Sequence, residues 1–159
     1  NGSSQIDHIV VSRLGIFVIE TKDYQGWIFG SADNEKWTQS LPRGNKFPLA
    51  NPIRQNWGHI QSLKGIFPTV SEDKFVNVVV FTEESEFKTA LPDNVVHIDG
   101  LVPYITKFQN QIIPEDMIYI IVGKLTFRNH TNHISASTHL ENLNNRPVKA
   151  QSPENPSPQ

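Results

Sequence analysis

The sequence QIDHIVVSRLGIFVIETK, residues 5–22, predicts two consecutive strands, 5–13 and 14–22, joined by a turn at Leu14 and Gly15. Both strands are rich in Ile, Val and Phe, and neither shows a clean polar face. We therefore expect both strands at the centre of a sheet, where each is covered on its two faces. Charged side chains on such strands call for an explanation.

Three charged residues stand out on these strands: Asp7 on the first, and Glu20 and Lys22 at the end of the second. Side chains alternate along a strand, so Glu20 and Lys22 share one face. An unpaired buried charge is strongly unfavourable, and such groups are normally paired or bind a metal. An acid, followed by an acid and a lysine at the end of the next strand, is typical of a metal-dependent nuclease. A structural ion pair is the alternative, because a Glu-x-Lys triplet alone is weak evidence.

The nuclease interpretation assigns a role to each of these groups. Hydrolysis of a phosphodiester requires hard cations, and Mg²⁺ takes a few oxygen ligands while keeping waters elsewhere. We expect Asp7 and Glu20 to bind Mg²⁺ or Mn²⁺, with the main-chain carbonyl of Thr21 as a third ligand. Lys22 would position the attacking water or stabilise charge in the transition state. Gln55, in the first turn of the following predicted helix, could orient water or a phosphate oxygen.

The remaining sequence predicts strands first and then helices alternating with strands. SLPRGNKFPLANP, residues 40–52, reads as a loop because it holds three prolines and a glycine. Asn51 is expected to cap a helix that has Pro52 at its first position and ends near Phe67. Further strands are expected at 26–30, 36–40, 75–81 and 95–98, and further helices at 99–109, from Pro114 onward and at 135–144. After Pro114 the β-branched residues leave a strand open. The pattern predicts an α/β fold with helices flanking a mixed central β-sheet.

Composition narrows the classes of function. The 159 residues contain no cysteine, which excludes disulfides, cysteine-bound zinc and a thiol nucleophile within them. The formal net charge of −2 provides no overall basic field, so contacts to phosphate must come from a local patch or a metal. No apolar run approaches the roughly 18 residues that span a bilayer, and no signal peptide opens the chain. We therefore expect a cytoplasmic protein without membrane contact.

Several segments of the sequence resemble those of a known family. QIDHIVVS, GIFVIETKDYQGWI and NPIRQN, together with WTQ, VVVFTEESEFK and VVHIDGLVPYI, resemble the NERD (nuclease-related) domain over about residues 2–145. That family is placed with the PD-(D/E)xK nucleases, so the resemblance implies a restriction-endonuclease-like fold. It also implies that Asp7 matches the metal-binding Asp of these enzymes, and that Glu20 and Lys22 match their ExK pair. Gln55 matches the helix glutamine of their exonuclease-like branches.

The chain also departs from the family pattern. His59 stands where the exonuclease-like branches often have a tyrosine. The pattern has a helix and a strand before the stretch equivalent to Gly2, so we expect a fold that lacks the usual first helix and strand. The NERD-like domain is expected over residues 1–145. From 146 to 159 the sequence is mostly Pro, Ser, Asn and Gln, which predicts a disordered tail or linker.

Five further residues are candidates for contact with substrate. Trp27 suits core packing best, and stacking on a nucleobase is the sharper alternative. Gln39 is expected near the active site from its family match, although a hydrogen bond at a sheet edge would explain it as well. Arg43, Lys46 and Arg54 gather in and after the proline-rich loop, where they could contact phosphates. Solvated loop charge is the alternative for these three cations.

Three classes of function remain. The first is an enzyme that hydrolyses DNA phosphodiester bonds with Mg²⁺ or Mn²⁺, and the three intact charged residues favour it. The second is a catalytically silent nucleic-acid-binding or scaffolding module, which the near-neutral net charge favours. A subunit that works with fused or separate DNA-processing domains is a third, since a proline-rich tail would serve as a linker. The sequence does not distinguish DNA from RNA or endonuclease from exonuclease action.

Overall fold

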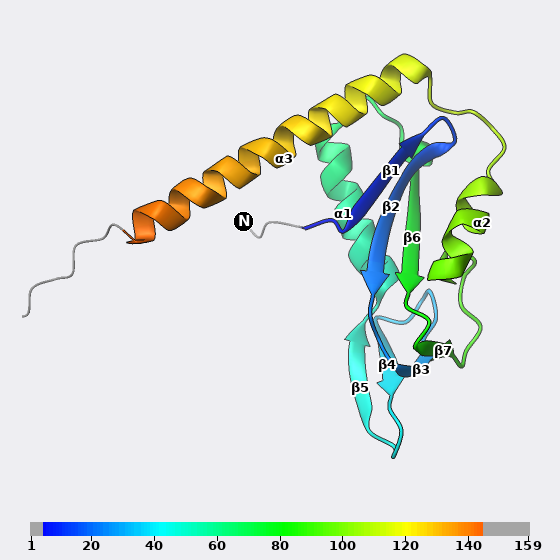
Figure 1. Cartoon of the computed structure of the whole chain (residues 1–159). Helices are drawn as coiled ribbons and strands as arrows, with labels where there is room; N and C mark the ends of the chain where they lie inside the picture. The colour runs from blue at the N-terminus through cyan, green and yellow to red at the C-terminus, as the bar shows by residue number, and fades with distance from the viewer. Residues whose placement is uncertain (1–4, 145–159) are drawn as a thin grey trace, which may run out of the picture. The chain divides into compact units, whose positions relative to one another are not determined.

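A computed structural model describes the backbone of residues 5–144 and the side chains of residues 5–129. The chain divides into two units, residues 1–121 and residues 122–159. The first unit carries two four-stranded sheets, and Figure 1 labels all of their strands except β8. The described part of the second unit, residues 122–144, is helical.

The first sheet contains the two strands predicted at the start of the chain. Its members are β1 (His8–Ser12), β2 (Gly15–Lys22), β6 (Phe75–Phe81) and β8 (Val95–His97). They lie in the order β1-β2-β6-β8, with β1 antiparallel to β2 and the other neighbours parallel. Both central strands, β2 and β6, are largely buried, as their apolar runs predict. The central position predicted for the first strand is wrong, because β1 lies at the edge of the sheet and its side chains are partly or fully exposed. The predicted α/β class with a mixed sheet is confirmed, and the architecture is consistent with a restriction-endonuclease-like fold.

The remaining strands form a second sheet, where the sequence had predicted one central sheet. Its members are β3 (Gly26–Phe29), β4 (Lys36–Ser40), β5 (Lys46–Ala50) and β7 (Ser85–Phe87), in the order β5-β4-β3-β7. The loop predicted for residues 40–52 is therefore wrong over 46–50. Pro48 is tolerated there because β5 is an edge strand, where a missing N–H need not break a ladder. Strand β7 was not predicted, since three residues carry no readable periodicity.

Helix α1 (Pro52–Ile66) begins as predicted. The side chain of Asn51 accepts hydrogen bonds from the main-chain N–H groups of Ile53 and Arg54, and its own amide group donates to the β3–β4 loop, to the carbonyl of Asn34 among others. This fully buried Asn51 therefore fixes both the start of the helix and its attachment to the second sheet.

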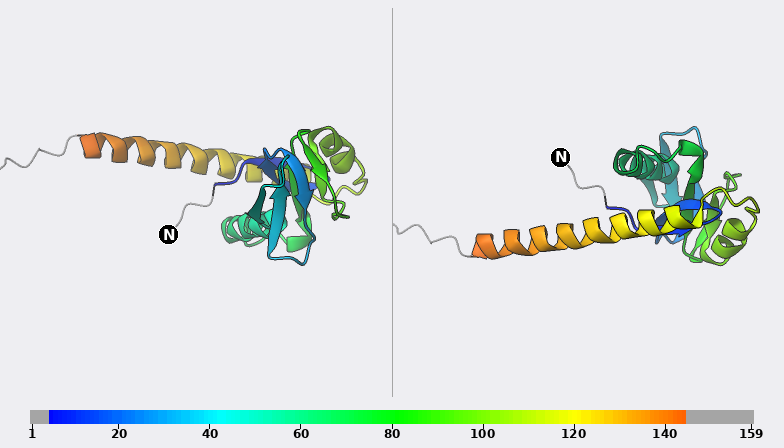
Figure 2. Two further views of the ribbon diagram at one scale, coloured as in Figure 1. Left: turned by 90° about the horizontal axis from the view of Figure 1, so that it is seen from below. Right: turned by 90° about the horizontal axis from the view of Figure 1, so that it is seen from above.

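The two faces of the first sheet are covered by different elements. One face packs toward the second sheet through a cluster that includes Trp37, Val79 and Phe81. The other face packs on α2 (Leu101–Thr106) through a cluster that includes Phe17 and Val80. Figure 2 shows α1 and α2 on opposite faces of this sheet. Two short 3₁₀ turns, Glu72–Lys74 and Ile98–Gly100, precede β6 and α2. The helix predicted for 99–109 is thus shorter than expected.

The last described element is α3 (Glu115–Asn144), one helix that joins the two helical segments predicted from Pro114 and at 135–144. The strand left open after Pro114 does not form. None of the helices in the described part of the chain has a stretch long and apolar enough to cross a bilayer. The tail predicted over 146–159 lies outside the described residues.

Candidate active site

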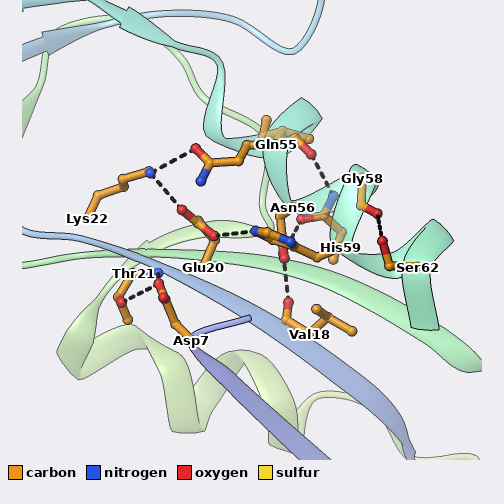
Figure 3. Close-up of polar contacts among 12 residues, drawn as sticks. Asp7, Val18, Glu20, Thr21, Lys22, Gln55, Asn56, Gly58, His59 and Ser62 are labelled. Carbon is orange, nitrogen blue, oxygen red and sulfur yellow. Dashed lines mark hydrogen bonds and ion pairs between the residues drawn. The ribbon is translucent and has the colours of Figure 1, made fainter. Parts of the chain in front are cut away.

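Glu20 and Lys22 lie at the carboxyl end of β2, on the face that α1 covers. The Lys22 ammonium donates to Oε1 of Glu20 at 2.6 Å and to Oε1 of Gln55 at 3.0 Å (Figure 3). Glu20 is 3% exposed, whereas Lys22 keeps partial contact with solvent. The structure therefore brings together three of the predicted site residues, in an environment where charge interacts more strongly than in water.

His59 is a fourth member of this group, and the sequence analysis gave it no role. Its Nε2 atom lies 3.2 Å from Oε2 of Glu20, and both side chains are almost completely enclosed. The two oxygens of Glu20 thus face two different nitrogen groups, from Lys22 and from His59. A signal was present in the sequence: His59 follows Gln55 by four residues, and residues four apart lie on one face of a helix.

Asn56 holds α1 in the position that this group requires. Its side chain is fully buried, and Nδ2 donates to the carbonyl of Val18 at 2.7 Å, to Oδ1 of Asn77 at 2.8 Å and to the carbonyl of Val78 at 3.1 Å. These bonds tie the helix to both central strands of the first sheet. Gln55 is adjacent to Asn56 and reaches Lys22 because the helix is pinned at this point.

Asp7 lies just before β1 and makes a different set of contacts. Its Oδ2 accepts hydrogen bonds from the main-chain N–H of Thr21 at 2.9 Å and from the Thr21 hydroxyl at 2.7 Å. Burial raises the pKa of Asp7, but the two Thr21 bonds and the charges of Lys22 and His8 outweigh it, so the pKa lies below its ordinary value. Figure 3 shows the Asp7 carboxylate turned to Thr21, apart from the group around Glu20.

The strand register nevertheless brings the backbones of Asp7 and Glu20 close together. His8 pairs with Ile19, so one further step along the ladder sets Asp7 opposite Glu20. Residues opposite each other on antiparallel strands have Cα atoms about 4.5–5.5 Å apart. The bond from the Thr21 N–H to the Asp7 carboxylate continues the connection between the two chains beyond the end of β1.

The donor set suits a hard divalent cation better than zinc. Among the residues whose side chains are described, no three His, Cys, Asp or Glu side chains gather where they could hold a metal. Structural zinc sites need four ligands, whereas Mg²⁺ is usually bound by one or two carboxylates and retains several waters. The carboxylates of Asp7 and Glu20 and the carbonyl of Thr21 match the second requirement in number and in type of donor.

A hollow of about 510 Å³ lies beside Asp7. Most of its lining is apolar, including Ile9, Ile19 and Leu101. Ile19 and Thr21 point to the face of β2 opposite to that of Glu20, since side chains alternate along a strand. The hollow therefore opens on the α2 side of the sheet, away from Lys22 and Gln55.

The candidate substrate residues on the second sheet have distinct surroundings. Trp27 is 50% exposed, so it does not serve the core packing favoured from the sequence, and the Lys88 ammonium lies 4.9 Å from the centre of its ring. Gln39 donates through Nε2 to the carbonyl of Gln25 at 2.8 Å, in the segment between Lys22 and β3. This bond links β4 to the connection that leaves the candidate active site.

The three basic residues predicted near the proline-rich loop do not gather at one place. Arg43 lies in the exposed turn between β4 and β5 with a φ of 76°, and Lys46 begins β5. Arg54 lies past the other end of β5, roughly 13 Å of strand away. Its Nη2 donates to the carbonyl of Asp33 at 2.7 Å, in the loop before β4. The expected phosphate patch is therefore divided between the two ends of the sheet.

Comparisons with known proteins identify a family. The family model of the nuclease-related domain (NERD) matches residues 1–82, just over half of the chain, and this range includes Glu20, Lys22 and Gln55. An uncharacterized protein of Bacillus anthracis is 47% identical over 62 residues, which make up 39% of this chain and 29% of that protein. The match thus spans less than a third of that relative. No solved structure matches the chain.

Proposed function

This chain belongs to the nuclease-related domain (NERD) family, and we propose that it is a metal-dependent nuclease that hydrolyses DNA phosphodiester bonds. The single observation that supports the proposal most strongly is the position of Lys22. Its ammonium is held 2.6 Å from Glu20 and 3.0 Å from Gln55 at the end of a central strand, with a side chain 15% exposed. A cation in this setting is fixed in place and still within reach of a phosphate.

The chemistry requires a new bond between a water oxygen and phosphorus and the breaking of one bridging P–O bond. Negative charge grows on the phosphoryl oxygens as this happens, and a preorganised cation stabilises it. Lys22 serves as that cation. The side-chain oxygen of Gln55 accepts from Lys22, so the amide group of Gln55 can donate to a phosphate oxygen or to the attacking water.

Asp7 and Glu20, with the carbonyl of Thr21, are the residues that would hold Mg²⁺ or Mn²⁺. When bound, such an ion neutralises phosphate charge and polarises the attacking water. The Asp7 side chain is ionised at neutral pH, which is the form that binds a metal, and its lowered pKa extends this form to more acidic pH. His59 contributes indirectly, because its contact with Oε2 holds the Glu20 carboxylate in one orientation.

The proposal is tested with labelled single- and double-stranded DNA in Mg²⁺, Mn²⁺ or EDTA. We expect cleavage with either metal, none with EDTA, and a loss of about 100-fold or more in Glu20→Gln and in Lys22→Ala, as for removal of one transition-state contact. Lys64→Ala is a matched control, because Lys64 also pairs with a glutamate, Glu72, but in the last turn of α1. Cleavage that survives both site substitutions would place the reaction elsewhere.

A module that binds nucleic acid without cleaving it is the second candidate, and one observation favours it. Both oxygens of Glu20 already face nitrogen groups of Lys22 and His59, and Asp7 accepts two bonds from Thr21. These carboxylates therefore already have close polar contacts within the protein. DNA binding that persists in EDTA, with no cleavage in either metal, would support this function over hydrolysis.

A further inference from the structure

The second sheet presents one face whose side chains the proposed active site does not use. Strand register pairs Trp27 with Ser40 on β4 and with Glu86 on β7, and pairs Ser40 with Lys46 on β5. Residues paired across strands, and alternate residues along a strand, project to the same face. We call the face that these rules define the outer face, formed chiefly by Trp27, Phe29, Lys36, Lys46, Glu86 and Lys88.

On β3, exposure separates the outer face from the core face. Ile28 is 0% exposed within the apolar cluster between the sheets, whereas its neighbour Trp27 is 50% exposed. Half of an indole side chain left in water forgoes the burial that normally stabilises such a large ring. The exposed ring is instead available for a partner with a flat π surface.

Charge on the outer face is positive although the whole chain has a net charge of −2. Three lysines, Lys36, Lys46 and Lys88, lie there with a single acid, Glu86. Lys88 forms an ion pair with Glu86, and its ammonium lies 4.9 Å from the centre of the Trp27 ring. Lys36 and Lys46 are exposed. The face therefore combines a half-exposed aromatic ring with local cations, which is the composition of surfaces that bind single-stranded nucleic acids.

We infer that the outer face binds single-stranded DNA, with a base stacked on Trp27 and the sugar–phosphate backbone in contact with Lys46 and Lys36. The choice of DNA as partner rests on the proposed function. A single strand is required because an indole stacks only on a base whose flat surface is open, and in a duplex those surfaces are covered by neighbouring pairs. Strand β3 begins four residues after Lys22, so the outer face and the candidate active site are close along the chain.

Binding is measured in EDTA, so that it does not depend on hydrolysis. The probe is a fluorescein-labelled oligothymidylate, compared by anisotropy with an abasic strand of equal length and with a blunt duplex. We expect the oligothymidylate to bind more tightly than either. Trp27→Ala should weaken its binding about 5- to 150-fold, the range for loss of one base–aromatic stack, and should leave abasic binding unchanged. Trp27→Phe, which retains a ring, should lose less.

Two controls separate the outer face from general effects. Trp57 is 43% exposed on α1, so Trp57→Ala removes a similarly exposed indole elsewhere and should leave binding unchanged. Lys46→Ala should lower the slope of log affinity against log salt by about 0.7, the value for one phosphate contact to a single strand. Circular dichroism confirms that each variant is folded.

The inference is overturned if Trp27→Ala and Trp57→Ala have equal effects, if abasic and base-containing strands bind alike, or if no strand binds. It stands independently of catalysis: base-dependent binding through Trp27 in EDTA, with no cleavage in Mg²⁺ or Mn²⁺, would refute the nuclease proposal and leave the outer face as a binding surface. Cleavage in Mg²⁺ or Mn²⁺ together with binding that does not depend on Trp27 would support the nuclease proposal and refute the outer face as a binding surface.

Discussion

Nε2 of His59 lies 3.2 Å from Oε2 of Glu20, and the two side chains are 9% and 5% exposed. The other oxygen of the same carboxylate, Oε1, accepts a hydrogen bond from the Lys22 ammonium at 2.6 Å. A buried carboxylate is tolerated only when it is paired, so Glu20 depends on both of these partners. One of them comes from its own strand and the other from α1.

Replacing His59 should therefore destabilise the fold. We expect His59→Ala to lower the free energy of unfolding by about 1–3 kcal/mol, because one oxygen of the buried Glu20 loses its partner. His59→Gln should recover part of the loss, since an amide N–H can donate to the same oxygen. Urea unfolding measures both, with Gln61→Ala as the control at an exposed position of the same helix. Equal stability of His59→Ala and Gln61→Ala would contradict the pairing.

The lowered pKa of Asp7 predicts that part of the stability of the folded protein is lost in acid. The pKa of Asp7 in the folded protein lies below the ordinary value of 3.8, because burial, which raises the pKa, is outweighed by the hydrogen bonds from Thr21 together with the charges of Lys22 and His8. The folded state therefore holds the proton less tightly than the unfolded state. The stabilisation is complete well above pH 3.8 and is lost as the pH falls below that value toward the folded pKa.

Asp7→Asn should remove this component. Between neutral pH and pH near 3, the urea midpoint of the wild-type protein should fall further than that of Asp7→Asn. Thr21→Val removes one of the two hydrogen bonds and should move the pKa of Asp7 upward, as followed by NMR titration of its side-chain carbonyl. If the urea midpoint of Asp7→Asn fell with pH as much as that of the wild type, Asp7 would contribute nothing to the pH dependence of stability.

Asn56 should be among the least replaceable residues of α1. Asn56→Ala leaves the carbonyls of Val18 and Val78 without this buried donor, which should cost at least about 2 kcal/mol. Asn56→Asp should cost more, because it sets a carboxylate oxygen against those carbonyls. Chemical denaturation of the two variants checks the order. The reverse order, with Asp tolerated better than Ala, would contradict the donor role assigned to the Asn56 amide.

Two glycines offer substitutions of opposite sign. A Cβ atom on Gly30 would lie 2.2 Å from the ring of the buried Trp37, so Gly30→Ala should force the ring to move and destabilise the protein by about 1–3 kcal/mol. A Cβ atom on Gly58, inside α1, meets nothing within 4 Å. Gly58→Ala should therefore stabilise by about 0.5–1 kcal/mol. Thermal unfolding of the two variants checks both expectations: Gly30→Ala should unfold at a lower temperature than the wild type, and Gly58→Ala at a higher one.

Local signals in the sequence predicted several elements well. The apolar runs of β2 and β6 and the cap at Asn51 appear in the structure as expected. Each depends on neighbours along the chain: side-chain period in a strand, or a polar side chain that binds the first N–H groups of a helix. Signals of this kind survive folding because tertiary contacts reinforce them.

Elements that depend on remote pairing were missed. The five residues of β5 contain Pro48 and lie in a proline-rich stretch, and they become a strand because β4 offers them an edge. Strand β7 has three residues and forms by pairing in parallel with β3, some 60 positions earlier in the chain. No local pattern records such a partner. The division of strands between two sheets has the same origin.

The candidate site also has one part that depends on local sequence and one part that depends on contacts between distant segments. Alternation along β2, a property of covalent geometry, sets Glu20 and Lys22 on one face whatever the rest of the chain does. The arrival of Gln55 and His59 beside them, and the turning of the Asp7 carboxylate to Thr21, depend on where α1 and β1 dock. Docking is settled by buried contacts between distant segments, such as the bonds of Asn56 to both central strands, and the order of residues alone does not record them.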